Sequence, residues 1–231
     1  MYYCVDMTAK HLKWPFIGLL GAFILATNVA ENSTFGISSE WSSKSGYRLS
    51  AGTQPWALVF SLVAIGLYFL LMYVPPARLS DPLPVVFRRF VAFWLDFVLA
   101  IMAIAPILGI IPMLTEWKRT GVFRWHFERS THVTGDGYLA FGGVSVGFAA
   151  LIFYYALPLF WSRPSPGTCI AGYQVVPDSG IKLTLRTAIL RTLLGFIAAA
   201  GAYFAPFAER NRKQGKFWLD KVFNTRAVRM E

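Results

Sequence analysis

Five long apolar runs alternate with short polar segments along this chain. The runs are residues 14–30, 54–74, 90–113, 138–161 and 188–207. A helix of roughly 20 apolar residues is long enough to cross a bilayer hydrocarbon core of about 30 Å. The pattern therefore predicts an all-α fold, a polytopic bundle of transmembrane helices, and argues against a single soluble core.

The first run has features of both a signal peptide and a retained span. Lys10 and Lys13 precede it, as basic residues precede the apolar part of a secretory signal. A cleavage site after Ala30 would place Asn28 at a position where signal peptidases require a small residue. We therefore predict that this run is kept as the first membrane span.

The polar segments between the runs carry loop and strand signals. Residues 31–53 are rich in Ser and Gly, so we expect an exposed loop there. In residues 123–128 aromatic and charged side chains alternate, which indicates a short strand or an interfacial segment. Residues 173–176 and 181–185 flank a Pro-Asp-Ser-Gly turn, and we predict that they form a small β-hairpin in a cytoplasmic loop at the membrane surface.

The distribution of Lys and Arg tests how the chain crosses the membrane, because cytoplasmic loops are enriched in both. If the N-terminus is inside and all five runs cross, eight basic residues lie inside and thirteen outside. If the N-terminus is outside and all five runs cross, thirteen basic residues lie inside and eight outside. If the fifth run enters and returns on the same side, fifteen lie inside and six outside, with Arg191 counted as part of the run.

We favour this last arrangement, four spans plus a re-entrant or tilted fifth segment. Gly195, Gly201 and Pro206 interrupt the fifth run, and such residues permit a broken helix where protein covers the backbone. The C-terminal tail is then cytoplasmic.

Composition narrows the class of protein further. Hydrophobic residues make up 55% of the 231, charged residues 15%, and the net charge is +10. The basic residues lie in short loops and the tail, so we expect anionic lipid headgroups as partners and no nucleic acid. The two cysteines, Cys4 and Cys169, lack the spacing of a disulfide framework or a zinc site. Together with the lack of targeting motifs, this cysteine usage favours a bacterial cytoplasmic membrane.

No sequence motif for a nucleotide, a metal-dependent hydrolase or a serine hydrolase is present. The three histidines lie outside the apolar runs, which argues against a histidine-bound haem or pigment in the membrane. We therefore expect that the protein is not an enzyme and that it has neither a cofactor nor a metal site.

Asp96 is the strongest candidate for chemistry, because it lies inside the third run. An ionised carboxylate within a bilayer costs several kcal/mol unless it is paired, hydrated or protonated. Arg89 lies seven residues earlier, about two helical turns and roughly 10 Å away on the same face. Arg191 in the fifth run is a possible partner for Asp96. Asp96 could thus bind a proton or cation, or it could form a structural salt bridge between two helices.

Asp220 is a second acidic candidate. It follows the cluster Phe217-Trp-Leu219 in the basic tail. We expect it to cap a turn or to pair with a nearby Lys or Arg.

The stretch Arg89-Phe-Val-Ala-Phe-Trp-Leu-Asp96 resembles the opening of the RDD family of membrane proteins, which is named for one arginine and two aspartates. Arg89, Ala92 and Asp96 match the arginine at the start of the family's first helix, the alanine three residues later and the aspartate seven residues later.

Three further segments resemble RDD motifs in the same order. Ser165-Pro-Gly-Thr168 resembles a Thr-Pro-Gly-Lys turn, without its lysine. Arg191 matches a following arginine, and Asp220-Lys-Val-Phe-Asn-Thr225 resembles the closing motif. The resemblance implies an RDD-like membrane domain at residues 85–231, with residues 1–84 as an added transmembrane helical hairpin. It also implies a charge site at Arg89, Asp96, Arg191 and Asp220, and transport, which includes sodium/proton exchange in some members.

Two functions of different class remain open. The first is a transporter coupled to a proton or small cation through Asp96. The second is a non-catalytic accessory or assembly subunit of a larger membrane complex, bound to other subunits or to itself, since the chain has one intramembrane carboxylate and no catalytic motif. Gly143-Val-Ser-Val-Gly147 is a small-residue motif that lets helices pack closely, either within the protein or against a partner. A lipid-binding scaffold that acts through the basic tail ranks behind both.

Overall fold

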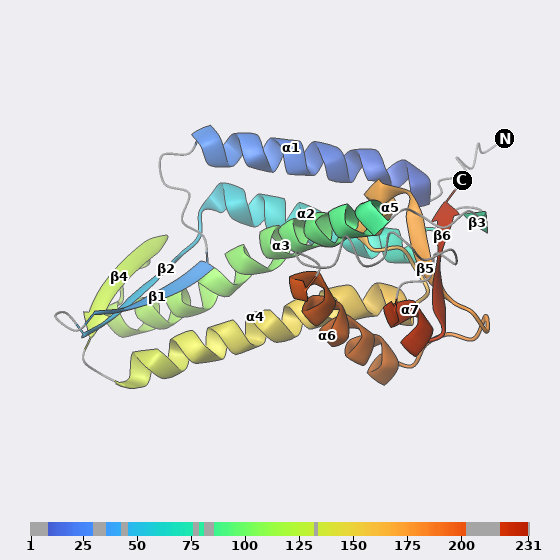
Figure 1. Ribbon diagram of the computed structural model, residues 1–231. Helices are drawn as coiled ribbons and strands as arrows, with labels where there is room; N and C mark the ends of the chain where they lie inside the picture. The colour runs from blue at the N-terminus through green and yellow to red at the C-terminus, as the bar shows by residue number, and fades with distance from the viewer. Residues whose placement is uncertain are drawn as a thin grey trace. The chain divides into compact units, whose positions relative to one another are not determined.

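The computed structural model of this chain describes residues 9–29, 36–42, 46–75, 79–80, 86–131, 134–201 and 218–230. It is mainly helical, with two small sheets (Figure 1). The helices are η1 (Ala9–Leu12), α1 (Lys13–Val29), α2 (Pro55–Tyr73), α3 (Val86–Thr120), α4 (Thr134–Phe160), α5 (Pro166–Ala171), α6 (Leu185–Gly201) and α7 (Trp218–Val222). The strands are β1 (Gly36–Ser42), β2 (Gly46–Gly52), β3 (Leu79–Ser80), β4 (His126–Thr131), β5 (Tyr173–Pro177) and β6 (Thr225–Met230).

Four of the described helical segments are long and apolar enough to cross a membrane. They are Ala9–Val29, Pro55–Tyr73, Phe87–Thr120 and Phe141–Phe160. These segments confirm the predicted polytopic helical architecture. The described part of the fifth apolar run, residues 188–201, lies in α6, which has 17 residues and is not among the four, and the rest of the run lies outside the described residues. Many large apolar side chains on the four helices are exposed, as expected for surfaces that face lipid.

The chain forms two compact units, and each of α1, α2, α3 and α4 contributes to both. The first unit contains the start of α1 and α3, the end of α2 and α4, and everything from residue 152 onwards. Among the described residues, eleven Lys and Arg belong to the first unit and five to the second. Both units therefore draw on residues from each side of the predicted domain boundary at residue 84.

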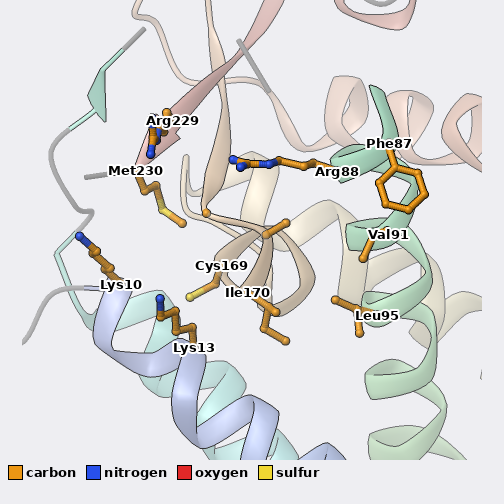
Figure 2. Close-up of a pocket in the computed structure, with 12 residues that line it drawn as sticks. Lys10, Lys13, Phe87, Arg88, Val91, Leu95, Cys169, Ile170, Arg229 and Met230 are labelled. Carbon is orange, nitrogen blue, oxygen red and sulfur yellow. The ribbon is translucent and has the colours of Figure 1, made fainter. Parts of the chain in front are cut away.

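In the first unit, hydrogen bonds join segments that are far apart in sequence. The Cys169 thiol of α5 donates to the Ala9 carbonyl of η1 at 3.0 Å. The Met230 amide of β6 donates to the Gly172 carbonyl at 3.1 Å. Figure 2 shows Cys169 and Met230 with Lys10 and Lys13 beside them. These bonds fix both ends of the described chain against the short helix α5.

The strand β5 confirms one half of the predicted hairpin, but its partner differs from the prediction. β5 pairs antiparallel with β6, from Tyr173 opposite Arg229 to Pro177 opposite Thr225. Residues 181–184 are not a strand, and Leu185 begins α6. The reason is burial, because β6 offers buried side chains at 225, 227, 228 and 230 whereas Ile181 and Lys182 are exposed. The end of the basic tail is thus the central strand of the sheet β3-β6-β5.

The second unit holds the sheet β1-β2-β4. The expectation of an exposed loop over residues 31–53 is wrong for β1 and β2, which pair from Gly36 opposite Gly52 to Ser42 opposite Gly46. The Ser-rich sequence resembles a loop, and the strands could not be predicted from it alone. Their sheet also depends on β4, which pairs with β2 and lies some 80 residues away in the sequence. The predicted strand near residues 123–128 is present as β4 and begins at His126.

Close packing also shapes the second unit. A Cβ added at Gly147 would lie 2.8 Å from Leu108 Cδ1, so this glycine of the small-residue motif packs within the chain. The Ser61 hydroxyl donates to the Ala103 carbonyl and joins α2 to α3.

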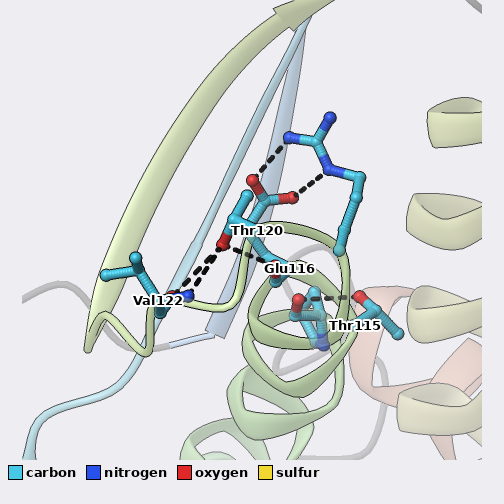
Figure 3. A network of polar contacts seen from close by, with 6 residues as sticks. Thr115, Glu116, Thr120 and Val122 are labelled. Atoms are coloured by element: carbon cyan, nitrogen blue, oxygen red, sulfur yellow. Dashed lines mark hydrogen bonds and ion pairs between the residues drawn. The ribbon is translucent and has the colours of Figure 1, made fainter.

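The C-terminal end of α3 closes with local polar contacts (Figure 3). Arg119 donates to both carboxylate oxygens of Glu116, at 2.6 and 3.1 Å. The Thr120 hydroxyl donates to the Glu116 carbonyl at 2.9 Å, and Gly121 adopts a positive φ of 73°. A positive φ at glycine is a common way to end a helix. The apolar span therefore ends in side chains that suit a polar environment.

Candidate functional site

Asp96 of α3 is buried, and donors from two other segments meet its carboxylate. The Ser165 hydroxyl donates to Oδ2 at 2.5 Å, and the Gly167 amide donates to Oδ1 at 2.6 Å. The Tyr154 hydroxyl of α4 lies 3.5 Å from Oδ1. Only 2% of Asp96 is exposed. Hydrogen bonds to a buried carboxylate replace the water that it loses.

The sequence Ser-Pro-Gly-Thr explains why these donors are available. Ser165 is the N-cap of α5, and its side chain accepts the Thr168 amide at 3.3 Å. Pro166 occupies the first turn, where its missing N–H costs nothing. Gly172 ends the helix in the left-handed conformation, with φ 74° and ψ 33°. The amide of Gly167, left free by the first turn, therefore points at Asp96.

Close contact between α3 and α5 requires small residues at two positions. A Cβ added at Gly167 would lie 2.1 Å from the Ala92 carbonyl oxygen and 2.7 Å from Asp96 Cγ. Ala92 is itself fully buried. The alanine and glycine of the two motifs thus let the backbone of α5 lie against α3, which brings the Gly167 amide to the carboxylate.

A second buried carboxylate, Asp220 of α7, is shared by two arginines. Arg89 Nη1 lies 2.6 Å from Oδ2, and Arg191 Nη2 lies 2.8 Å from Oδ1. The Thr225 hydroxyl donates to Oδ1 at 3.2 Å and accepts from Arg191 Nε at 3.3 Å. Asp220 is fully buried. The Asp220 carboxylate therefore joins α3, α6 and α7. Two arginines share this one carboxylate, so the group has a net charge of +1.

The structure separates the four predicted site residues into two groups. Arg191 was a possible partner for Asp96, but it pairs with Asp220 instead, and so does Arg89. Asp96 is satisfied by neutral donors. The expected pairing of Asp220 with a basic side chain is present, although both partners are distant in sequence. Sequence analysis did not assign Ser165 and Tyr154 to the site, although Ser165 opens the Ser-Pro-Gly-Thr motif.

A cavity of about 200 Å³ lies between the two groups, and we call it the Asp96 cavity. Asp96, Ser165 and Thr168 line one part of it, and Arg89, Arg163 and Arg191 line another. Phe93 and Tyr155 add aromatic walls, with ring centroids 5.4 Å apart. Arg89 Nη2 is buried and makes no hydrogen bond among the described residues. The cavity is thus lined by the buried carboxyl group of Asp96, by hydroxyl groups and by positively charged arginines.

Metal binding has no geometric support in the described part of the chain, which contains no group of three or more His, Cys, Asp or Glu side chains placed to share an ion.

Gly167→Ala tests the close contact between α3 and α5. The added methyl group collides with backbone, so we expect a loss of about 1–3 kcal/mol, the usual cost of overpacking. Thermal unfolding of the purified chain in detergent measures it. Gly66→Ala is the matched control, because nothing lies within 4 Å of its added Cβ. A Gly167→Ala variant as stable as Gly66→Ala would contradict the contact.

Asp220→Ala tests the buried ion triad. It leaves two arginines without their anion, and breaking a buried pair costs about 3–5 kcal/mol. Asp178→Ala is the control, since Asp178 lies 3.9 Å from Arg226 and both are partly exposed. Such a surface pair contributes at most about 1 kcal/mol. Equal shifts in the unfolding midpoints of the two variants would count against the triad.

No curated protein and no solved structure matches the chain. The sequence model of the RDD family matches residues 83–224. That range contains Arg89, Asp96, Arg191 and Asp220, together with the Ser-Pro-Gly-Thr turn that holds Asp96. The match covers more than half of the chain, and the protein belongs to the RDD family of membrane proteins.

Proposed function

We propose that the protein is a proton-coupled membrane transporter in which Asp96 binds and releases the proton. The observation that carries this proposal is the position of Asp96, buried in a spanning helix yet lining a cavity with two hydroxyl groups. Ionisable residues inside membrane helices are costly and mark proton and ion pathways in many transporters.

The hydroxyl groups around Asp96 can accommodate both of its protonation states. When Asp96 is ionised, Ser165 donates to it. When Asp96 is protonated, its own O–H needs an acceptor, and the Ser165 oxygen is the nearest one. The Ser165 hydrogen can then turn to Thr168 Oγ1, which lies 3.1 Å away. A rotation of one hydroxyl group thus exchanges donor and acceptor without moving the backbone.

A proton suits this arrangement better than a metal cation does. A metal ion needs several oxygen lone pairs, whereas the groups that meet Asp96 are hydrogen-bond donors. Arg89, Arg163 and Arg191 line the same cavity and would repel a second cation.

The proposed orientation places the N-terminus and the C-terminal tail in the cytoplasm. With four spans and a re-entrant fifth segment, fifteen basic residues lie on the cytoplasmic side and six on the other, as the positive-inside rule favours. A bacterial cytoplasmic membrane is the proposed location.

An accessory or assembly subunit is the second candidate function. Gly18 and Gly21 of α1 have nothing within 4 Å of an added Cβ, so this face of α1 offers a close approach to another helix. A stoichiometric partner that stays bound after extraction in mild detergent would favour this function.

Proton movement in liposomes tests the transport proposal. The purified full chain is reconstituted with a trapped pH-sensitive dye, and a Na⁺ or K⁺ gradient is imposed. We expect the wild type to move protons and Asp96→Asn to lose the signal, because the amide cannot exchange a proton. Thr168→Val, which lacks the alternative acceptor, should slow the movement by about tenfold or more, within the usual effect of a proton-transfer group.

Asp178→Asn is the control for this assay, since Asp178 is exposed and does not line the Asp96 cavity. Unchanged proton movement in a folded Asp96→Asn variant would sink the proposal. A wild type that moves no protons under either gradient would favour the subunit function instead.

A further inference from the structure

A second and larger cavity, here called the basic pocket, lies in the first unit and is lined in part by Cys169, Ile170 and Ala171 of α5. Its volume is about 650 Å³. Lys10, Lys13, Arg88 and Arg229 line it from three segments (Figure 2). No Asp or Glu is among the described residues that line it. Within the described residues, none of these four cations has a carboxylate oxygen within 4 Å. Among the described residues, the pocket is therefore a concentration of positive charge without a carboxylate counter-ion.

The structure brings these cations together through contacts of α5. The Cys169 thiol holds Ala9, the residue before Lys10, and burial raises the pKa of this thiol to about 12, so it stays a neutral donor. The Gly172 carbonyl holds the amide of Met230, the residue after Arg229. Residues from both ends of the chain are thus fixed beside Arg88 of α3. The pocket is built by tertiary contacts and is not a chance feature of one helix.

The walls of the basic pocket change from charged to apolar along α3. Arg88, Val91 and Leu95 are spaced three and four residues apart, so they share one face of the helix. Arg88 lies at the start of a candidate span, and Val91 and Leu95 lie further into it. Ile170 of α5 adds a further apolar side chain. A ligand that fits this wall is anionic at the membrane surface and apolar towards the bilayer interior.

The positions of the lysines place the charge at the same level of the membrane. Lys10 and Lys13 lie in the first five residues of the span Ala9–Val29, as Arg88 lies in the first two of the span Phe87–Thr120. Lipid phosphate groups occupy the interface where spans begin. Basic pockets between membrane helices on the cytoplasmic side are a known way to bind anionic lipid headgroups.

We propose that the basic pocket binds an anionic phospholipid, with its phosphate among Lys10, Lys13, Arg88 and Arg229 and an acyl chain along Val91, Leu95 and Ile170. Lys10, Lys13 and Arg229 lie outside the residues that match the RDD family, 83–224. Three of the four cations therefore come from segments outside the family match, whereas Arg88 and the apolar wall lie within it. It does not depend on transport through Asp96.

Lipid titration of the purified full chain tests the proposal. Short-chain phosphatidylglycerol is added in detergent, binding is followed by native mass spectrometry, and the same amount of phosphatidylcholine serves as the neutral lipid. We expect phosphatidylglycerol to bind and phosphatidylcholine not to bind measurably. The double variant Lys13→Gln and Arg88→Gln should bind phosphatidylglycerol about tenfold more weakly or worse, at the usual contribution of each basic residue.

Lys182→Gln with Arg186→Gln is the matched control, because it removes the same charge from exposed residues of the first unit that line neither cavity. We expect it to retain phosphatidylglycerol binding. Inorganic phosphate and glycerol 3-phosphate separate a lipid from a free phosphate compound. Binding of these two as strong as that of the lipid would overturn the lipid assignment, and equal loss of lipid binding in both double variants would overturn the site. The unfolding temperature in phosphatidylcholine checks that each variant is folded.

Discussion

The hydrogen bonds from Ser165 and Gly167 to the Asp96 carboxylate hold the first unit together. They fix the start of α5 against α3, and α5 in turn holds η1 through Cys169 and β6 through Gly172. A buried carboxylate without such donors would be too costly to keep in a membrane protein. The same interaction therefore stabilises the fold and keeps an ionisable group at the wall of a cavity.

The short helix α5 has a different role on each side. Ser165 and Thr168 line the Asp96 cavity, whereas Cys169 and Ile170 line the basic pocket. Any change in the bonds of Asp96 thus acts on a helix that also lines the proposed lipid site. Asp220 secures the neighbouring segments, because its two arginines come from α3 and α6 while it lies on α7. The four segments that resemble RDD motifs therefore form two carboxylate-centred contacts rather than one chain of charges.

Local pattern was sufficient to predict the apolar spans, the strand at β5 and the charged residues that form the buried contacts. Run length and hydropathy depend on neighbouring residues, so the four spans were predictable from sequence. The partners of these residues and strands could not be predicted from sequence. The sequence alone does not indicate that Arg191 pairs with Asp220, or that β5 pairs with β6 rather than with residues 181–185. These choices depend on burial across more than 25 residues of intervening chain. The role of Ser165 was missed for the same reason, since its acceptor lies 69 residues earlier.

A double-mutant cycle between Asp96 and Ser165 tests the central contact most directly. The free energies of unfolding of the wild type, Asp96→Asn, Ser165→Ala and the double variant are measured in one detergent. Hydrogen bonds to charged groups contribute about 1.5–3 kcal/mol, so we predict a coupling energy in that range. For independent sites, the effect of the double variant equals the sum of the two single effects to within about 0.5 kcal/mol. Such additivity between Asp96 and Ser165 would contradict the account.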